Sequence, residues 1–172
     1  MRRASSVFWG SALAILAADQ LTKWWAVRTL EGAPPTAVVG DWARLVLVYN
    51  PGAAFGLHVG DWSREIFATL TVLALVVLWR LYRTASPAER ARVWATGFVA
   101  GGALGNLVDR VRNPHGVVDF LDLGVGDLRW PTFNVADVAV SLGALLLAWV
   151  LRDDAAAAEP GAASGASGVE AR

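Results

Sequence analysis

Aspartates are the residues in this sequence best suited to hydrolytic chemistry. The chain has no cysteine, which excludes thiolate nucleophiles and cysteine-bound metals. Its two histidines, His58 and His115, form no H-E-x-x-H zinc motif, and Ser141 lies in an apolar run without a nearby histidine. Two carboxyl groups that share one proton can hydrolyse an amide. The residue types alone leave the choice of pair open among Asp19, Asp109, Asp119, Asp122 and Asp137.

Asp19 and Lys23 lie four residues apart, with Thr22 between them, so all three share one face of a helix. This order, acid first, favours a local ion pair. In the plainer interpretation the pair is only that, with Lys23 reaching outward. In the functional interpretation the pair shapes a polar site, because an acid within a membrane is costly unless it is paired or faces a wet cavity.

Two further pairs of polar residues are three positions apart, Asn106 with Asp109 and Asn134 with Asp137. Each pair therefore shares a helix face. Asp109 could simply form an interfacial cap with Arg110, and Asp137 could be a helix N-terminal charge favoured by the helix dipole. The alternative for both is a shared polar site.

The elements that would position these residues are apolar stretches of membrane-spanning length. The chain is 55% hydrophobic and 17% charged, with nine tryptophans, an excess of apolar residues for a soluble domain of 172 residues. Stretches of about 17–25 apolar residues cross a bilayer as helices. We expect one transmembrane domain over 1–154, an all-α four-helix bundle with spans at about 7–27, 66–82, 93–108 and 133–151.

The charges of the loops predict the orientation. Arginines precede the first span and crowd the connection between the second and third, which predicts that both regions are cytoplasmic. Both termini then lie in the cytoplasm. The first span could also be a cleaved signal peptide, but its run continues to the interfacial tryptophans Trp24 and Trp25, and three spans follow.

The longer outer segments predict a small sheet and a second loop. Ala37–Val39 and Leu45–Tyr49 are β-prone, with Gly40 and Asp41 as a turn between them. Residues 110–132 form the second outer loop, and 155–172 a disordered cytoplasmic tail of Ala, Gly and Ser. With this topology many polar groups converge near the outer membrane boundary: Asp19, Lys23, Asn50, Asp109, Arg110, Asp119, Asn134 and Asp137.

The third span also carries glycines at every fourth position, Gly97, Gly101 and Gly105, with Gly102 beside them. Such a stripe allows close approach of helices and predicts packing rather than ligand binding.

Five strings in this order resemble the lipoprotein signal peptidases, over about residues 19–143. They are D-Q-L-T-K, N-P-G-A-A-F-G, G-G-A-L-G-N-L-V-D-R, V-V-D-F and W-P-T-F-N-V-A-D, beginning at Asp19, Asn50, Gly101, Val117 and Trp130. Only the loop 112–116 has no confident alignment.

The resemblance implies an inner-membrane aspartic endopeptidase that removes the signal peptide of prolipoproteins, cutting just before a diacylglyceryl-modified cysteine. It implies that Asp119 and Asp137 are the catalytic pair. By the same resemblance, other polar positions frame this pair or lie near the substrate: Asn106, Asp109, Arg110, Asn134, Asp19, Lys23, Asn50 and Gly52. The outer sheet and a mobile loop over the site would fall at 32–62.

We expect no cofactor, metal or nucleic acid; the partners are the lipidated substrate and membrane lipid, and the protein acts as a monomer. One alternative is a transport or assembly subunit, which predicts acids spread across the membrane depth. Another, a presenilin-type protease, requires a G-x-G-D string that the sequence lacks.

Overall fold

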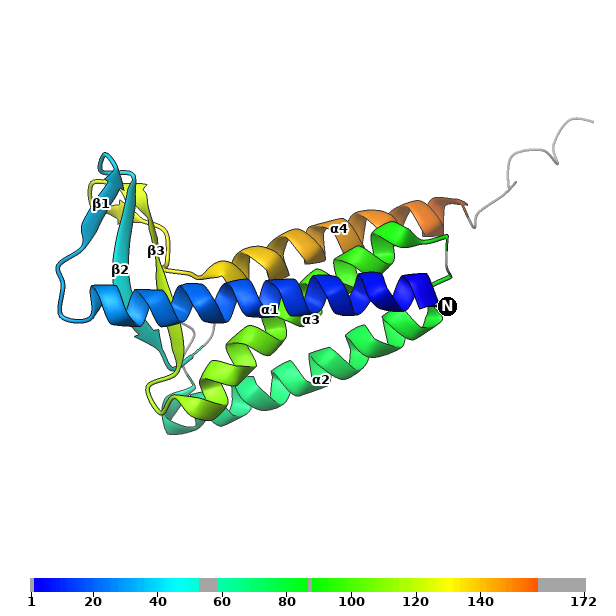
Figure 1. Ribbon diagram of the computed structural model, residues 1–172, viewed down its shortest axis with the longest axis horizontal. Helices are drawn as coiled ribbons and strands as arrows, with labels where there is room; N and C mark the ends of the chain where they lie inside the picture. The colour runs from blue at the N-terminus through cyan, green and yellow to red at the C-terminus, as the bar shows by residue number, and fades with distance from the viewer. Residues whose placement is uncertain (1, 53–58, 87, 158–172) are drawn as a thin grey trace, which may run out of the picture.

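Four long helices and a small sheet make up the computed structural model, which describes residues 2–52, 59–86 and 88–157. The helices are α1 (Arg2–Leu30), α2 (Ser63–Thr84), α3 (Arg90–Arg112) and α4 (Val135–Ala157), with a short 3-10 turn, η2 (Gly60–Trp62), before α2. They lie alongside one another, with the sheet across one end and the N-terminus at the other (Figure 1). The predicted helices are confirmed, and each is longer than its predicted span apart from the start of α4.

The ends of α4 differ from the prediction for local reasons. The helix begins at Val135, two residues after the predicted start, because Phe133 pairs with a strand through a bridge to Leu121. It continues to Ala157, so the first residues of the predicted tail are helical. The rest of that tail, 158–172, lies outside the described residues, as do 53–58 of the predicted mobile loop.

The sheet has four antiparallel strands in the order β1-β2-β3-β4. The strands β1 (Thr36–Val39) and β2 (Ala43–Asn50) confirm the predicted pair, and Gly40 takes a positive φ of 51° in the turn between them. The strands β3 (Val117–Val125) and β4 (Leu128–Arg129) come from the segment predicted as a loop. The predicted sheet was therefore incomplete, because its acids broke the apolar pattern that identifies strands.

α3 packs against each of the other three helices. The glycine stripe makes this possible: a Cβ on Gly101 would lie 2.6 Å from the backbone oxygen of Ala12, and one on Gly102 would lie 2.5 Å from that of Ala136. The row Gly97, Gly101 and Gly105 thus faces α1, and Gly102 faces α4. The predicted packing role of these glycines is confirmed.

Apolar side chains form two separate clusters. One lies toward the N-terminal end of α1, around Phe8, Leu78 and Val93, and the other lies under the sheet, around Leu30 and Phe120. Polar residues fill the space between them, including the fully buried Asp19 and Asn134. The interior of the bundle is therefore polar at the depth where α1, α3 and α4 meet the sheet.

Two helices of the described part of the chain, Gly60–Thr84 and Val135–Arg152, are long and apolar enough to cross a membrane. Apolar side chains on these helices are widely exposed, for example Leu73 and Leu145. α1 and α3 are of similar length, but polar and small residues on their packed faces lower their hydropathy.

Candidate active site

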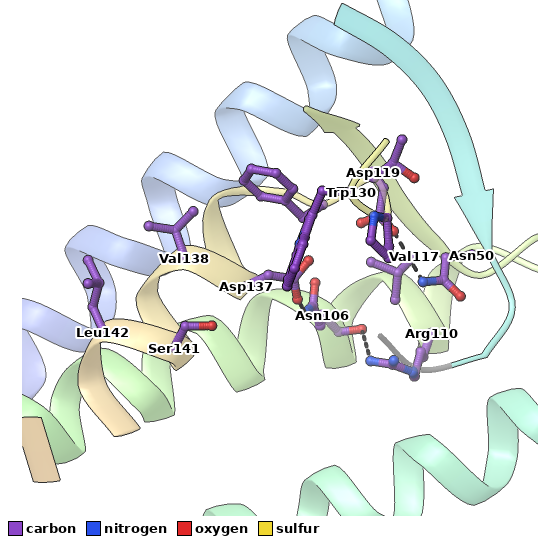
Figure 2. A pocket seen from close by; sticks show the side chains of 13 residues that line it. Asn50, Asn106, Arg110, Val117, Asp119, Trp130, Asp137, Val138, Ser141 and Leu142 are labelled. Atoms are coloured by element: carbon purple, nitrogen blue, oxygen red, sulfur yellow. Dashed lines mark hydrogen bonds between the residues drawn. The ribbon is translucent and has the colours of Figure 1, made fainter. Parts of the chain in front are cut away.

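A cavity of about 310 Å³ opens where the sheet meets α3 and α4. Two carboxylates line it, Asp119 from β3 and Asp137 from the first turn of α4 (Figure 2). The other polar lining residues are Asn50, Asn106, Arg110, Thr132 and Ser141, and apolar walls come from Val117, Trp130, Pro131, Phe133, Val138 and Leu142. The cavity thus combines a few converging polar groups with an apolar wall, as ligand sites commonly do.

Asp119 is almost completely buried, with 2% of its surface exposed. Its two oxygens accept hydrogen bonds from Asn134 Nδ2 at 2.7 Å and from Asn50 Nδ2 at 3.2 Å. Burial raises the pKa of Asp119 to about 7, the negative charge of Asp137 adds to the rise, and the two amide donors oppose it. Asp119 therefore exchanges its proton near neutral pH.

Asp137 is fixed by the cap of its own helix. The backbone N–H of Asp137 donates to Asn134 Oδ1 at 3.0 Å, and the backbone N–H of Asn134 donates to Asp137 Oδ2 at 3.2 Å. This is a reciprocal capping box with Asn134 as the N-cap and Asp137 at the third helical position. The plainer expectation of a helix N-terminal charge is thus met, and the same residue also lines the cavity.

Asn106, on α3, connects Asp137 to Lys23 of α1 and to Asn134. Its Nδ2 donates to Asp137 Oδ1 at 2.8 Å, while its Oδ1 accepts from Lys23 Nζ at 2.8 Å and from Asn134 Nδ2 at 3.1 Å. An ammonium group can only donate, so Lys23 fixes which end of the Asn106 amide faces it. The N–H end of Asn106 is thereby left to face Asp137.

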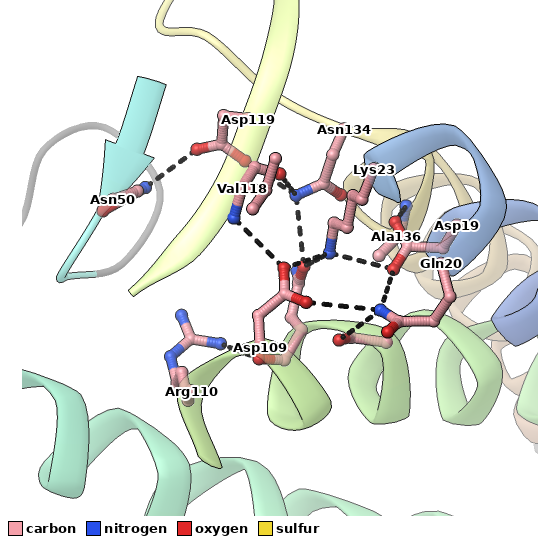
Figure 3. A network of polar contacts seen from close by, with 12 residues as sticks. Asp19, Gln20, Lys23, Asn50, Asp109, Arg110, Val118, Asp119, Asn134 and Ala136 are labelled. Carbon is pink, nitrogen blue, oxygen red and sulfur yellow. Dashed lines mark hydrogen bonds and ion pairs between the residues drawn. The ribbon is translucent and has the colours of Figure 1, made fainter. Parts of the chain in front are cut away.

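Lys23 is the centre of a buried ionic cluster (Figure 3). Its Nζ lies 2.9 Å from both Asp19 Oδ2 and Asp109 Oδ2, and its side chain is 3% exposed. The predicted Asp19–Lys23 pair is confirmed, and it extends to Asp109. Asp109 thus pairs with Lys23 rather than forming the cap with Arg110 that was one alternative. Removing one member of such a cluster typically costs about 3–5 kcal/mol, because it leaves a buried charge unpaired.

The acids of this cluster also hold backbone on other elements. Asp19 Oδ1 accepts from the N–H of Ala136 at 2.9 Å, at the start of α4, and Asp109 Oδ2 accepts from the N–H of Val118 at 3.1 Å, on β3. Ala136 precedes Asp137 and Val118 precedes Asp119. The cluster therefore fixes the backbone next to each cavity carboxylate.

Arg110 closes the cavity on the side of β2. Its Nη2 donates to the carbonyl of Gly52 at 3.0 Å, and the N–H of Gly52 donates to Asn50 Oδ1 at 3.0 Å. This local turn leaves Asn50 Nδ2 to face Asp119. The predicted residues Asn50, Gly52 and Arg110 are thus linked to one another and to the cavity.

The sequence identified the polar positions but not the whole site. Gln20 donates to Asp19, Asp109 and the carbonyl of Gly105, and only its place beside Asp19 hinted at this role. The cavity wall at 130–133 was not identified as part of the site, because its mostly apolar residues carry no chemical signal. Ser141 was set aside because no histidine lies near it in the sequence. Asp122 is the one candidate acid that pairs on the sheet, with Arg129 at 2.8 Å. Within the described residues, no group of three or more His, Cys, Asp or Glu side chains could hold a metal ion.

Comparisons with known proteins are consistent in the family they indicate. Residues 11–152 match a family model described as signal peptidase (SPase) II. The chain is 39% identical over 140 residues to a lipoprotein signal peptidase of Moorella thermoacetica, covering 81% of this chain and 89% of the relative. It is 43% identical over 139 residues to that of Cupriavidus taiwanensis, covering 79% and 77%. A solved structure of a bacterial membrane enzyme superimposes with a TM-score of 0.74 at 26% identity, covering 88% of this chain and 90% of the other.

Proposed function

This chain belongs to the signal peptidase II family, and we propose that it removes signal peptides from diacylglyceryl-modified prolipoproteins by an aspartic mechanism. The family resemblance carried by the five sequence strings is confirmed by these matches. Membership makes the protein a protease that acts in lipoprotein processing. The catalytic residues, the membrane arrangement and the position of the cut are the parts that we propose.

The observation that carries the proposal is the pair of carboxylates on one cavity. Asp119 and Asp137 come from different elements, and the charge of Asp137 contributes to raising the pKa of Asp119 to about 7. Two carboxyl groups coupled in this way favour a state with one proton between them. Amide hydrolysis needs both a proton acceptor for water and a proton donor for the carbonyl oxygen, and this state supplies both.

In the proposed reaction, Asp137 takes a proton from a water molecule whose oxygen attacks the scissile carbonyl carbon. Asp119 gives its proton to the carbonyl oxygen, which yields a neutral tetrahedral intermediate. Asp137 then returns its proton to the leaving nitrogen as the C–N bond breaks, and Asp119 regains a proton as the new carboxyl group forms. Asn106 and Asn134 hold the two carboxylates through N–H donors throughout this cycle.

We propose that all four helices span the inner membrane, with both termini cytoplasmic and the cavity near the extracytoplasmic face. The low hydropathy of α1 and α3 is compatible with this, because their polar residues pair inside the bundle. The carboxylates of Asp19, Asp109 and Asp137 lie together at the sheet end of the bundle. This arrangement favours the enzyme over the alternative of a transport subunit, whose acids would be spread across the membrane depth. We propose that the protein acts as a monomer.

The test is cleavage of a diacylglyceryl-modified prolipoprotein by the purified protein in lipid. We expect the lipidated substrate to be cut just before its modified cysteine, which mass spectrometry of the product measures, and an unlipidated control to remain intact. Asp119→Asn and Asp137→Asn should each abolish cleavage, because neither amide can carry the proton that the mechanism moves.

Asp122→Asn is the matched control. It makes the same chemical change on the same strand as Asp119, three residues away, at an acid that pairs with Arg129 on the sheet. We expect it to retain activity. Full activity of either Asp119→Asn or Asp137→Asn would refute the assignment of the pair, and loss of activity in Asp122→Asn with a normal yield of folded protein would point to a different acid.

A further inference from the structure

Ser141 carries a hydroxyl that lines the cavity but has no hydrogen-bond partner within the described residues. Eight other serine and threonine hydroxyls of the helices donate to a backbone carbonyl three or four residues earlier, those of Ser11, Thr22, Thr29, Ser63, Thr69, Thr71, Thr84 and Thr96. In an apolar environment such internal bonds are the usual way to satisfy a helical hydroxyl. The hydroxyl of Ser141 is therefore available to a ligand.

The position of Ser141 relates it to the proposed catalytic pair. It lies four residues after Asp137, so both side chains project from the same face of α4 (Figure 2). The rise of a helix separates them by about 6 Å, on the side away from the sheet. The neighbouring lining residues of α4 are Val138 and Leu142, which have no polar group. Ser141 is thus a single hydroxyl in an apolar part of the cavity wall.

When a substrate peptide is bound in the cavity, its polar backbone lies against this apolar part of the wall. The residues at the scissile bond must be extended to reach both carboxylates, so their carbonyls lose the internal bonds of a helix. An unpaired backbone carbonyl in apolar surroundings is costly. An extended chain advances about 3.3 Å per residue, so the separation of about 6 Å corresponds to about two residues.

We propose that the hydroxyl of Ser141 donates a hydrogen bond to a backbone carbonyl of the bound signal peptide, about two residues before the scissile bond. The carbonyl lies before the scissile bond, on the signal-peptide side, for the following reason. α4 runs from the sheet into the bundle, so Ser141 lies deeper than Asp137, and the apolar signal peptide lies in the membrane at that depth. This inference rests on the proposed function and adds a substrate-binding residue to it. The bond is to backbone, so it binds signal peptides of different sequence.

Three substitutions separate the hydroxyl from the shape of the side chain. Ser141→Thr keeps the hydroxyl, Ser141→Val has the shape of threonine without it, and Ser141→Ala removes it with the smallest change in volume. We expect KM for a diacylglyceryl-modified prolipoprotein peptide to rise roughly three- to tenfold in the Ala and Val variants with kcat little changed, because the bond is made equally in ground and transition states. The Thr variant should stay within about twofold of the wild type.

A change in the substrate identifies the carbonyl. An ester in place of a peptide bond makes the carbonyl a weaker acceptor, and substrates with one ester at each position before the cut can be compared. At the carbonyl bound by Ser141, the effects of the ester and of Ser141→Ala should be non-additive, whereas at other positions they should add.

The outcomes distinguish this inference from the proposed function. If the wild type cuts the peptide and the Ala and Val variants have its KM, the inference is overturned and the peptidase assignment stands. Equal impairment of the Thr and Val variants would also overturn it, because shape would then be the cause. If the wild type does not cut the lipidated peptide at all, the proposed function itself fails.

Discussion

Replacing Asp119 by asparagine should make the stability of the protein less dependent on pH. Burial raises the pKa of Asp119 from 3.8 to about 7, a difference of about three units. Each unit corresponds to about 1.4 kcal/mol, so the ionised carboxylate lowers the free energy of unfolding by about 4 kcal/mol once the pH exceeds 7. Asparagine carries no charge at any pH and removes this penalty.

The sign follows from which state binds the proton more tightly. Between pH 4 and pH 7 the folded protein keeps a proton on Asp119 that the unfolded chain has lost, so the stability that this group contributes falls as pH rises through that window. From pH 5 to pH 8 the wild type should lose about 3 kcal/mol through this group alone. That loss corresponds to roughly 6–12 °C in melting temperature for a chain of this size.

The assay is thermal unfolding of wild type and Asp119→Asn in the same detergent at pH 5 and pH 8. The substitution also disturbs the hydrogen bonds from Asn50 and Asn134, but that cost is nearly the same at both pH values. The quantity compared is therefore the change in melting temperature between pH 5 and pH 8, which should be larger in the wild type than in Asp119→Asn. Equal shifts in the two proteins would refute the reasoning that burial of an ionisable Asp119 opposes folding at neutral pH.

Three further predictions concern the same region. Peptidase kcat/KM should fall as pH rises through about 7, because Asp119 then loses the proton it must donate; a pH–rate profile measures this, and a profile flat to pH 9 would contradict it. Asn106→Asp should lower kcat roughly a hundredfold, because a carboxylate oxygen would replace the N–H that faces Asp137; single-turnover kinetics measure the step, and wild-type kcat would count against this role. Gly105→Ala should destabilise the fold by about 1–3 kcal/mol, because its Cβ would lie 2.3 Å from Asp19 Oδ2; an unchanged melting temperature would show that the helices can separate without cost.

The helices were predictable because a bilayer-length apolar run has few alternative structures. The ends of the helices were harder to predict. Asn134 is a favourable N-cap residue, but the predicted span began one residue earlier because Phe133 is apolar, and Phe133 in fact pairs with β3. The strand β3 was missed because Asp119 and Asp122 interrupt its apolar residues. Both acids are buried there, one facing the cavity and the other paired with Arg129, so the strand is buried although its composition is not apolar throughout.

For the site, spacing predicted neighbours on one helix but not contacts between helices. The spacing of Asp19 and Lys23 predicted their pair, and the spacing of Asn134 and Asp137 predicted a shared face. The contact of Lys23 with Asp109 joins α1 to α3, and no local pattern encodes it. The assignment of the catalytic pair came from family resemblance, since charge and spacing alone left five aspartates equivalent.

The central place of α3 has a consequence for how the protein is made. Lys23 emerges from the ribosome 83 residues before its partner Asn106, which at about 5–20 residues per second is an interval of roughly 4–17 s. In the proposed arrangement of four spans, α1 has to enter the membrane during this interval without α3. Asp19 is already present one turn before Lys23, and the two neutralise each other within the same helix. The Asp19–Lys23 ion pair, which belongs to the ionic cluster of the folded enzyme, thus also neutralises the charges of α1 until the partners on α3 have been synthesised.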